Sequence, residues 1–296
     1  MRLISMFSSE MLKLNREELK NAIKSSESRV ILSENIVSYR GPGEVITNSE
    51  IARAFGADLI LLNFFDLFKK EIYGLDNTED PIRELKKLVG RPIGVNLEPV
   101  SSGENAFDEI ISIENGRMAT TETIQELDKL GFDFVCFTGN PKTGVSNENI
   151  LKAVCEAKKH FSGLIIAGKM HSSGIDEKLV SLEFTKKLVE SGADVILLPC
   201  VYTAPSVRRE ELIEIVDYAH SKNALVMGTI GTSQESSPES VIREIALKNK
   251  EIGIDIFHIG DAGYGGISNY LNILELSRAI RGDRHTIRII SSSINR

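Results

Sequence analysis

Tryptophan is absent from this sequence of 296 residues, and aromatic residues make up only 6% of it. Single-stranded nucleic acids bind to aromatic platforms, and duplexes bind to basic surfaces that neutralise their phosphates. The chain has 42 acidic and 35 basic side chains, a net charge of −7, so an excess of positive charge is also missing. We therefore expect no nucleic-acid partner.

Long apolar runs and cysteine pairs are missing as well. No run approaches the roughly 20 apolar residues that a membrane-spanning helix needs, and the first stretch, MRLISMFSSEMLKLN, lacks the apolar core of a signal peptide. The cysteines are Cys136, Cys155 and Cys200, an odd number without C-x-x-C spacing. That usage is typical of a reducing compartment. We expect a cytoplasmic protein with no membrane partner and no disulfide framework.

One pattern occurs four times along the chain: GADLILLN, GFDFVCFT, GADVILLP and GIDIFHIG, beginning at Gly56, Gly131, Gly192 and Gly253. The glycine suits the left-handed position that ends a helix. The aspartate then begins an apolar run of the length and composition of a strand covered on both faces. The copies lie too far apart for one strand and one helix between them, so another strand is expected in each interval.

Those further strands are SRVILSEN, RPIGVNLEP, GLIIAGKM and NALVMGTIG, beginning at Ser28, Arg91, Gly163 and Asn223. Eight strands alternating with helices predict a single (β/α)8 TIM barrel over residues 1–296, with a doubly wound open sheet as the rival. Residues 1–27 include NREELKNAIKS, an extra helix that would cap the barrel bottom. Residues 282–296 form a short C-terminal tail, which we interpret as an added strand or a subunit contact of a homo-oligomer.

Active sites of such barrels lie at the carboxyl ends of the strands. In RPIGVNLEP the apolar residues alternate with Asn96 and Glu98, so these two polar side chains are expected to point into the barrel. The same argument applied to residues 163–171 sends Ala167, Lys169 and His171 inward and leaves Ile166 and Met170 facing the helices. The candidate catalytic residues are Lys169, His171, Glu98 and Glu34. The candidate substrate-binding residues are Asn63, Asn96, Thr138, Asn140, His258 and Asp261.

Other interpretations of these residues stay open. A lysine at a strand end is often a surface residue, His258 fits a satisfied core histidine, and the amides fit a polar plug in the top layer of the barrel. Cys136 and Cys200 are interpreted as small core residues rather than nucleophiles.

The loops after the last two strands suit an anion. They read GTIGTSQESSPE and GDAGYGGISNY, and glycine lets backbone N–H groups approach a phosphate near a helix N-terminus. Glycine clusters also serve as plain turns, and the spacing is not the G-x-G-x-x-G of dinucleotide sites. The expected phosphate-binding residues are Gly231, Thr232, Ser233, Gly263, Gly265 and Gly266.

The segments GADLILLNFFD, RPIGVNLEP and LIIAGKMHSSG resemble those of BtpA/SgcQ-type barrels, over roughly the first two thirds of the chain. The sequence departs from that family at Leu62, where the family has a glutamate, and at Met170, which separates the lysine from the histidine. The resemblance implies a phosphate-binding barrel and supplies no reaction.

Three function classes follow. The first is an aldolase-like lyase or an isomerase acting on a small phosphorylated or carboxylated metabolite, with Lys169 as a Schiff-base nucleophile or as an electrostatic partner. The second is a metal-assisted hydrolase or isomerase using Glu98 and His171 with a divalent metal, although no H-x-x-x-H or D-x-D pattern supports one. The third is a barrel that binds a ligand or assists assembly without catalysis. The sequence requires no cofactor.

Overall fold

Eight parallel strands form a closed barrel in chain order, and β8 pairs with β1 to complete it. The computed structural model describes residues 1–76, 78–100, 110–263 and 265–296. This closure confirms the predicted TIM barrel and excludes the open sheet. The strands are β1 (Val30–Ile36), β2 (Leu59–Asn63), β3 (Ile93–Leu97), β4 (Phe134–Phe137), β5 (Leu164–Gly168), β6 (Val195–Pro199), β7 (Leu225–Ile230) and β8 (Ile256–Ile259).

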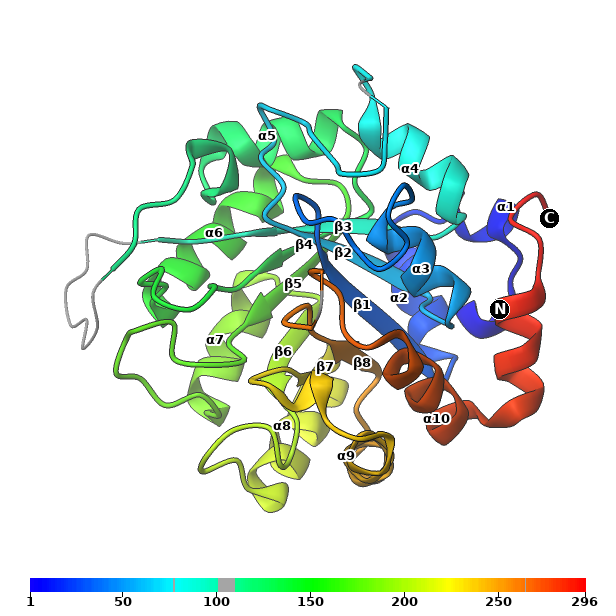
Figure 1. Ribbon diagram of the computed structural model, residues 1–296. Helices are drawn as coiled ribbons and strands as arrows, with labels where there is room; N and C mark the ends of the chain where they lie inside the picture. Colours follow the sequence, from blue (N-terminus) through cyan, green and yellow to red (C-terminus); the bar gives the residue numbers. More distant parts are fainter. Residues whose placement is uncertain (77, 101–109, 264) are drawn as a thin grey trace.

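A helix follows every strand and contributes to an outer ring around the barrel (Figure 1). These helices are α3 (Asn48–Ala54), α4 (Pro81–Val89), α5 (Thr121–Lys129), α6 (Asn147–His160), α7 (Leu182–Ser191), α8 (Arg209–Ser221), α9 (Glu239–Ile252) and α10 (Tyr270–Ser291). Three short 3-10 helices are η1 (Leu3–Ser5), η2 (Asn115–Arg117) and η3 (Gln234–Ser236). No described helix has both the length and the apolar content that crossing a membrane demands.

The barrel has two apolar layers. The outer layer lies between strands and helices and includes Ile93, Val95 and Leu97, as the alternation in β3 predicts. The inner layer fills the barrel, and it contains Ile166 and Met170 from the fifth strand region while Ala167 faces the helices. The predicted orientation of these three residues was therefore wrong. Both layers are apolar at this level of the barrel, so hydrophobicity does not distinguish the two faces of β5.

The chain before β1 closes the bottom of the barrel. Helices α1 (Ser8–Met11) and α2 (Arg16–Lys24) follow η1. Leu3, Ile4, Leu19 and Ile23 are buried in the same cluster as the inward side chains of the strands. This arrangement confirms the predicted capping segment.

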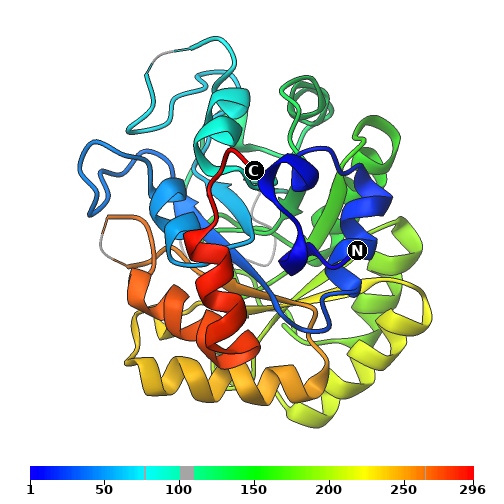
Figure 2. The same cartoon turned by 90° about the vertical axis from the view of Figure 1, so that its right-hand side faces the viewer.

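The C-terminal region is helical, which excludes the added strand, one of the two interpretations of residues 282–296, and leaves the subunit contact as a prediction. Helix α10 turns at Gly282, whose φ is 72°, and continues to Ser291. Figure 2 shows its last turns beside the N-terminal segment. There Arg288 donates a hydrogen bond to the carbonyl of Ser5, and Ser9 N donates to Arg296 O at 2.8 Å. The terminal helix therefore holds the bottom cap in place.

The four aspartates of the repeat make one shared contact, which we call the aspartate clamp. Each carboxylate accepts a hydrogen bond from a backbone N–H at the start of the preceding strand or next to its start, at 2.7–2.9 Å. Each aspartate also donates its own N–H to the backbone carbonyl of the clamped residue. The pairs are Asp58 with Ile31, Asp133 with Ile93, Asp194 with Ile165 and Asp255 with Val226. The repeated sequence thus encodes four links between neighbouring strands at the barrel bottom.

Every clamp has a basic partner. Asp58 pairs with Arg281 at 2.8 Å, and both side chains are fully buried. Asp133 pairs with the partly exposed Lys86, and Asp194 with Arg16. The clamp of Asp255 binds His220, and this hydrogen bond raises the pKa of the imidazole. The clamps differ mainly in how deeply the pair is buried.

Candidate functional site

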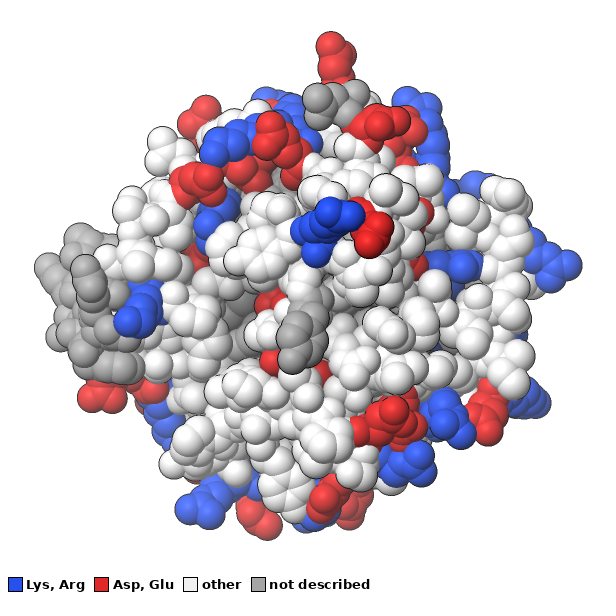
Figure 3. Space-filling model, in the orientation of Figure 1, with Lys and Arg blue, Asp and Glu red and all other residues white. Residues whose placement is uncertain are grey.

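A cavity of about 420 Å³ opens at the carboxyl ends of the strands. Carboxylates enter it from three positions, Glu34, Glu235 and Asp261. Figure 3 shows acidic atoms inside the central hollow of this face. The other residues that line it are Asn63, Asn96, Thr138, Gly139, Asn140, Pro141, Lys142, Met170, His171, Ser172, Ser173, Gly174, Gly231, Thr232, Ser233, Gly260 and Ala262.

Glu34 stands on the inward face of β1 and binds His258 of β8. Its Oε2 lies 2.7 Å from His258 Nε2, and the histidine is fully buried. The inward orientation expected for His258 is therefore observed, but His258 is not among the residues that line the cavity. Its role is to hold Glu34 from below.

Asp261 follows β8, and its side chain is partly buried. Its Oδ2 accepts a hydrogen bond from Asn63 Nδ2 at 2.8 Å. Burial raises the pKa of Asp261 to about 8, and the negative charge of Glu34 acts in the same direction. Asp261 is therefore mostly protonated at neutral pH.

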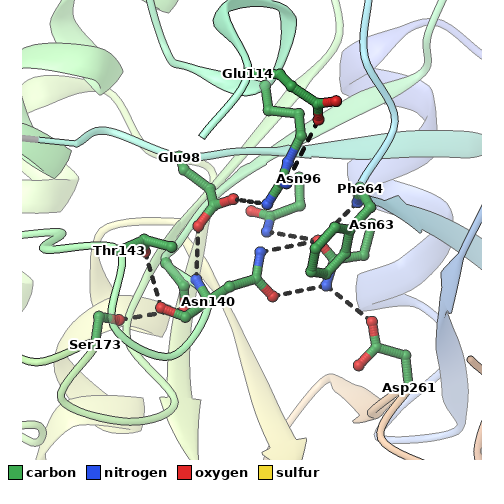
Figure 4. Close-up of polar contacts among 11 residues, drawn as sticks. Asn63, Phe64, Asn96, Glu98, Glu114, Asn140, Thr143, Ser173 and Asp261 are labelled. Atoms are coloured by element: carbon green, nitrogen blue, oxygen red, sulfur yellow. Dashed lines mark hydrogen bonds and ion pairs between the residues drawn. The ribbon is translucent and has the colours of Figure 1, made fainter. Parts of the chain in front are cut away.

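Three asparagines at the ends of β2, β3 and β4 form a hydrogen-bonded cluster (Figure 4). Asn63 donates to Asn140 Oδ1 at 2.9 Å, and its own Oδ1 accepts from Asn140 at 3.1 Å and from Asn96 at 3.2 Å. Phe64 N also donates to Asn63 Oδ1, which fixes the direction of this amide. The cluster fixes the orientation of Asn63 and therefore supports its hydrogen bond to Asp261.

Glu98 points inward as predicted, but it is held by neighbours and does not line the cavity. One oxygen accepts from Arg117 at 2.6 Å and the other from Asn140 N at 2.8 Å. The Arg117 guanidinium also stacks over the Phe64 ring, 4.0 Å from its centroid. Glu98 is therefore held between Arg117 and the Asn140 loop, and its expected catalytic role stays a prediction.

His171 lines the cavity as expected. Its Nδ1 accepts a hydrogen bond from Ser173 N at 3.1 Å, so a neutral ring carries its proton on Nε2. Burial lowers the pKa of His171, against the opposing effect of the Glu34 charge. At neutral pH the ring is uncharged and can donate a hydrogen bond from Nε2.

Lys169 does not line the cavity, so its predicted place beside His171 at the barrel mouth was wrong. Its Nζ lies 2.5 Å from Glu177 Oε2, and its side chain is 1% exposed. Strand β5 ends at Gly168, whose φ of 152° favours glycine and interrupts the alternation. Burial lowers the pKa of the lysine while Glu177 raises it. The Schiff-base chemistry expected of Lys169 lacks access to the cavity.

The two glycine-containing loops have different roles. Gly231, Thr232 and Ser233 line the cavity, as expected for ligand-binding residues. Gly263, Gly265 and Gly266 do not. A Cβ on Gly265 would meet Gly41, one on Gly266 would meet Ile36, and one on Gly263 would meet the loop's own backbone. Gly265 and Gly266 allow close packing against the β1 loop, and Gly263 against its own loop. The phosphate contact expected of the three stays a prediction.

Two residues with evident roles were missed from the sequence, Glu235 and Arg117. Glu235 comes directly after the loop of Gly231–Ser233, and a charged residue next to a mouth loop was the available signal. Arg117 lies 19 residues after Glu98 in the chain, and no pattern pointed to it. Burial raises the pKa values of the Cys136 and Cys200 thiols, in keeping with the core role expected for both.

No cluster of three or more His, Cys, Asp or Glu side chains in the described ranges is arranged to hold a metal ion. Glu98 is occupied by Arg117 and Asn140, so it is not free to join His171 in a ligand set. The metal-assisted alternative using these two residues therefore finds no support in the geometry.

A family described as "Domain of unknown function (DUF7916)" matches residues 4–296. None of the curated proteins matches the sequence. An archaeal fructose 1,6-bisphosphate aldolase has a similar structure, with a TM-score of 0.54 and 16% identity, over 87% of this chain and 95% of that one.

Two further solved structures are similar at lower scores. A 2,3-dimethylmalate lyase has a TM-score of 0.49 and 13% identity, over 86% of this chain and 81% of its own. The thiamine phosphate pyrophosphorylase of Pyrococcus furiosus has a TM-score of 0.48 and 15% identity, over 90% of this chain and 98% of its own. At such identities the likeness concerns the barrel fold, which the BtpA/SgcQ resemblance also implied. Membership of that particular group stays a prediction.

Proposed function

Since the chain belongs to the DUF7916 family, whose description states no activity, we propose a function from the cavity itself. The protein is an enzyme that transfers protons on a small carbonyl metabolite, as an isomerase or an aldolase-like lyase.

The protonation of Asp261 carries this proposal. A carboxyl group whose pKa is raised to about 8 shares one cavity with the Glu34 carboxylate. Two carboxyl groups in different protonation states are the usual arrangement for a general acid and a general base. Neutral His171 adds a donor of the kind that polarises a carbonyl oxygen.

The proposed reaction begins with a substrate carbonyl near His171 and Asp261. Glu34 removes a proton from the carbon next to the carbonyl, and the electron pair moves to the oxygen. Asp261 gives its proton to that oxygen, which completes an enediol. Glu34 then returns the first proton to the former carbonyl carbon. Asp261 takes back a proton from the hydroxyl oxygen on the other carbon, where the new carbonyl forms, and this gives the isomer. In a lyase, Glu34 instead deprotonates a hydroxyl group, and the carbon–carbon bond breaks to give the same type of enol.

A phosphate or carboxylate on the substrate would lie toward the outside of the cavity. Lys142 is exposed there, and the backbone of Gly231–Ser233 lines the same opening. These groups support a phosphorylated or carboxylated metabolite, the class expected from the sequence.

Proton exchange in D₂O tests the proposal without knowledge of the product. We expect the protein to replace a carbon-bound proton next to the carbonyl by deuterium in at least one aldose, ketose, sugar phosphate or 2-keto acid, as followed by ¹H NMR. Glu34→Gln should abolish the exchange, because an amide cannot accept the proton. Absence of exchange with wild-type protein across the panel would favour a barrel that binds without catalysis.

A further inference from the structure

The direction of the Asn63 side-chain amide decides what the Asp261 carboxyl group meets. Its Nδ2 donates to Asp261 Oδ2 at 2.8 Å and to Asn140 Oδ1 at 2.9 Å (Figure 4). Its Oδ1 accepts from Asn140, from Asn96 and from the backbone N–H of Phe64. Rotation of the amide by half a turn would place donors against donors and acceptors against acceptors at the contacts with Asn140, Asn96 and Phe64. These neighbours therefore define the observed direction.

Asp261 differs from these neighbours, because its neutral carboxyl group can accept or donate a hydrogen bond. With the observed direction of the amide, Asp261 Oδ2 accepts from Asn63, so the acid proton is best placed on the other oxygen. With the opposite direction, Asn63 Oδ1 would accept that proton itself. The acid would then donate to the asparagine instead of to a molecule in the cavity. Control over the amide is therefore control over where the acid proton is directed.

The first support of the amide comes from Arg117 through Glu98 and Asn140. Arg117 Nη2 donates to Glu98 Oε1 at 2.6 Å, and the other oxygen of Glu98 accepts from Asn140 N at 2.8 Å. The side chains of Arg117 and Glu98 are only 9% and 1% exposed, so water weakens this ion pair little. The pair fixes the backbone of Asn140, whose side-chain amide bonds to both ends of the Asn63 amide.

The second support comes through Phe64, the residue after Asn63. Phe64 has a φ of 60°, a left-handed conformation that is uncommon for a bulky residue and persists only where its surroundings hold it. The Arg117 guanidinium covers the Phe64 ring and provides such a hold. The N–H of Phe64 in turn donates to Asn63 Oδ1 at 2.9 Å. Arg117 therefore supports the amide by two routes, although it is not among the residues that line the cavity.

We propose that Arg117 is a positioning residue, which holds the Asn63 amide in the one direction that leaves the Asp261 proton for a molecule in the cavity. The use of that proton in catalysis rests on the proposed function, whereas the orientation of the amide does not. Substitution of Arg117 leaves in place the other titratable side chains that share the cavity with Asp261, which are Glu34, Lys142, His171 and Glu235.

Titration of Asp261 tests the orientation without any substrate. The ¹³C NMR signal of its carboxyl carbon is assigned by its absence in Asp261→Asn, and the wild-type midpoint is expected at the pKa of about 8. The hydrogen bond from Asn63 lowers this pKa, so either its loss or its reversal favours the neutral form. Arg117→Met should therefore move the midpoint to higher pH. An unchanged or lower midpoint would overturn the proposal.

Arg16→Met is the matched control. Arg16 also pairs with a buried aspartate, Asp194, at 2.8 Å, but it does so at the bottom of the barrel. This variant should lose stability and keep the Asp261 midpoint of the wild type. A shift as large as that of Arg117→Met would assign the effect to general destabilisation and refute the positioning role.

A second variant protects the test from a folding defect, because Arg117→Met leaves the buried Glu98 without a cation. The double variant Glu98→Met/Arg117→Met removes both charges and also removes the acceptor of Asn140 N. It should move the Asp261 midpoint in the same direction as Arg117→Met. A double variant that folds and titrates like the wild type would overturn the proposal.

Proton exchange on a carbonyl compound gives a second readout. Arg117→Met should lower kcat at least about tenfold, since a positioned general acid contributes about 10²–10⁴-fold. KM should change little, and the remaining activity should fall at a higher pH than in the wild type. An unchanged kcat would contradict the directed proton. A shifted midpoint in a protein that exchanges no proton removes the proposed reaction and keeps the positioning role, whereas exchange with an unshifted midpoint does the opposite.

Discussion

Glu34 Oε2 and His258 Nε2 lie 2.7 Å apart across the β1–β8 junction that closes the barrel. The contact has two effects: it links the first strand to the last, and it holds a carboxylate at the base of the cavity. His258 Nδ1 has no partner in the described structure, so Glu34 is the contact that orients this ring.

Replacement of His258 tests the first effect. His258→Leu should lower the free energy of unfolding by about 2–3 kcal/mol, because a buried carboxylate loses its charged hydrogen bond. Glu34→Gln keeps a hydrogen-bonding amide at the same place and should cost less. Urea unfolding of both variants measures the difference, and an equal or smaller loss for His258→Leu would contradict the role given to the histidine.

The pH dependence of the exchange reaction follows from two shifted groups. Asp261 acts as an acid only when protonated, so kcat/KM should fall as pH rises through about 8, the raised pKa of this carboxyl. The neutral form of the His171 ring is lost as pH falls through its pKa, and burial lowers this pKa below the ordinary value of 6.5. Activity should therefore be level around neutrality. Loss of activity already between pH 6.5 and 7.5 would contradict this assignment.

Lys169 should be dispensable for chemistry. Lys169→Met removes the ion pair with Glu177 outside the cavity, so proton exchange should persist in the folded variant. Stability should fall by about 1–3 kcal/mol, because a half-buried glutamate loses its charged partner. Glu177→Gln is the matched control for that loss. A borohydride-trapped adduct on wild-type Lys169 would contradict the observed placement.

Gly168 should tolerate no side chain. A Cβ there would lie 2.0 Å from Leu197 O, a backbone atom of the neighbouring strand. Gly168→Ala should therefore separate β5 from β6 and unfold the protein or lower its melting temperature severely. Gly131→Ala is the control, since its φ is 73° and nothing lies within 4 Å of the added methyl group. The control should lose only about 1–2 kcal/mol from backbone strain, and similar losses for both would contradict the steric argument.

The aspartate clamps differ in burial, and their loss should differ accordingly. Asp58→Ala leaves Arg281 without a counter-charge where both side chains are fully buried, and should cost about 3–5 kcal/mol. Asp133→Ala should cost about 1–3 kcal/mol, because Lys86 is 19% exposed and can turn to water. Thermal unfolding of the two variants measures this order. The reverse order would show that the partner's burial does not set the strength of a clamp.

The barrel could be predicted because its signals are local. Each strand and each helix has its own apolar pattern, and the repeated glycine–aspartate pair marks the same junction four times. Asn63, Thr138 and Asp261 were placed correctly for the same reason, since the ends of parallel strands meet at one edge. No long-range contact was needed for these predictions.

The errors in the site have long-range causes. The side-chain alternation predicted for Lys169 fails because the backbone of Gly168 has a φ of 152°, outside the usual strand conformation. The carbonyl of Leu197 in the neighbouring β6 lies too close to this position to admit a side chain. Glu98 is taken out of the cavity by Arg117, a residue that no sequence pattern connects to it. Gly265 and Gly266 let two loops pack together and Gly263 fits its own loop, and the sequence did not distinguish these roles from an anion site.

The four clamps also divide the barrel into four consecutive quarters. Each quarter contains two strands, and the carboxylate of its aspartate accepts its backbone hydrogen bond within the same quarter: β1 with β2, β3 with β4, β5 with β6 and β7 with β8. A chimera joined at a boundary between quarters keeps every clamp intact. A chimera joined inside a quarter separates an aspartate from the strand that it was selected to hold. The quarter is therefore the natural unit for recombining this barrel with another of the same architecture.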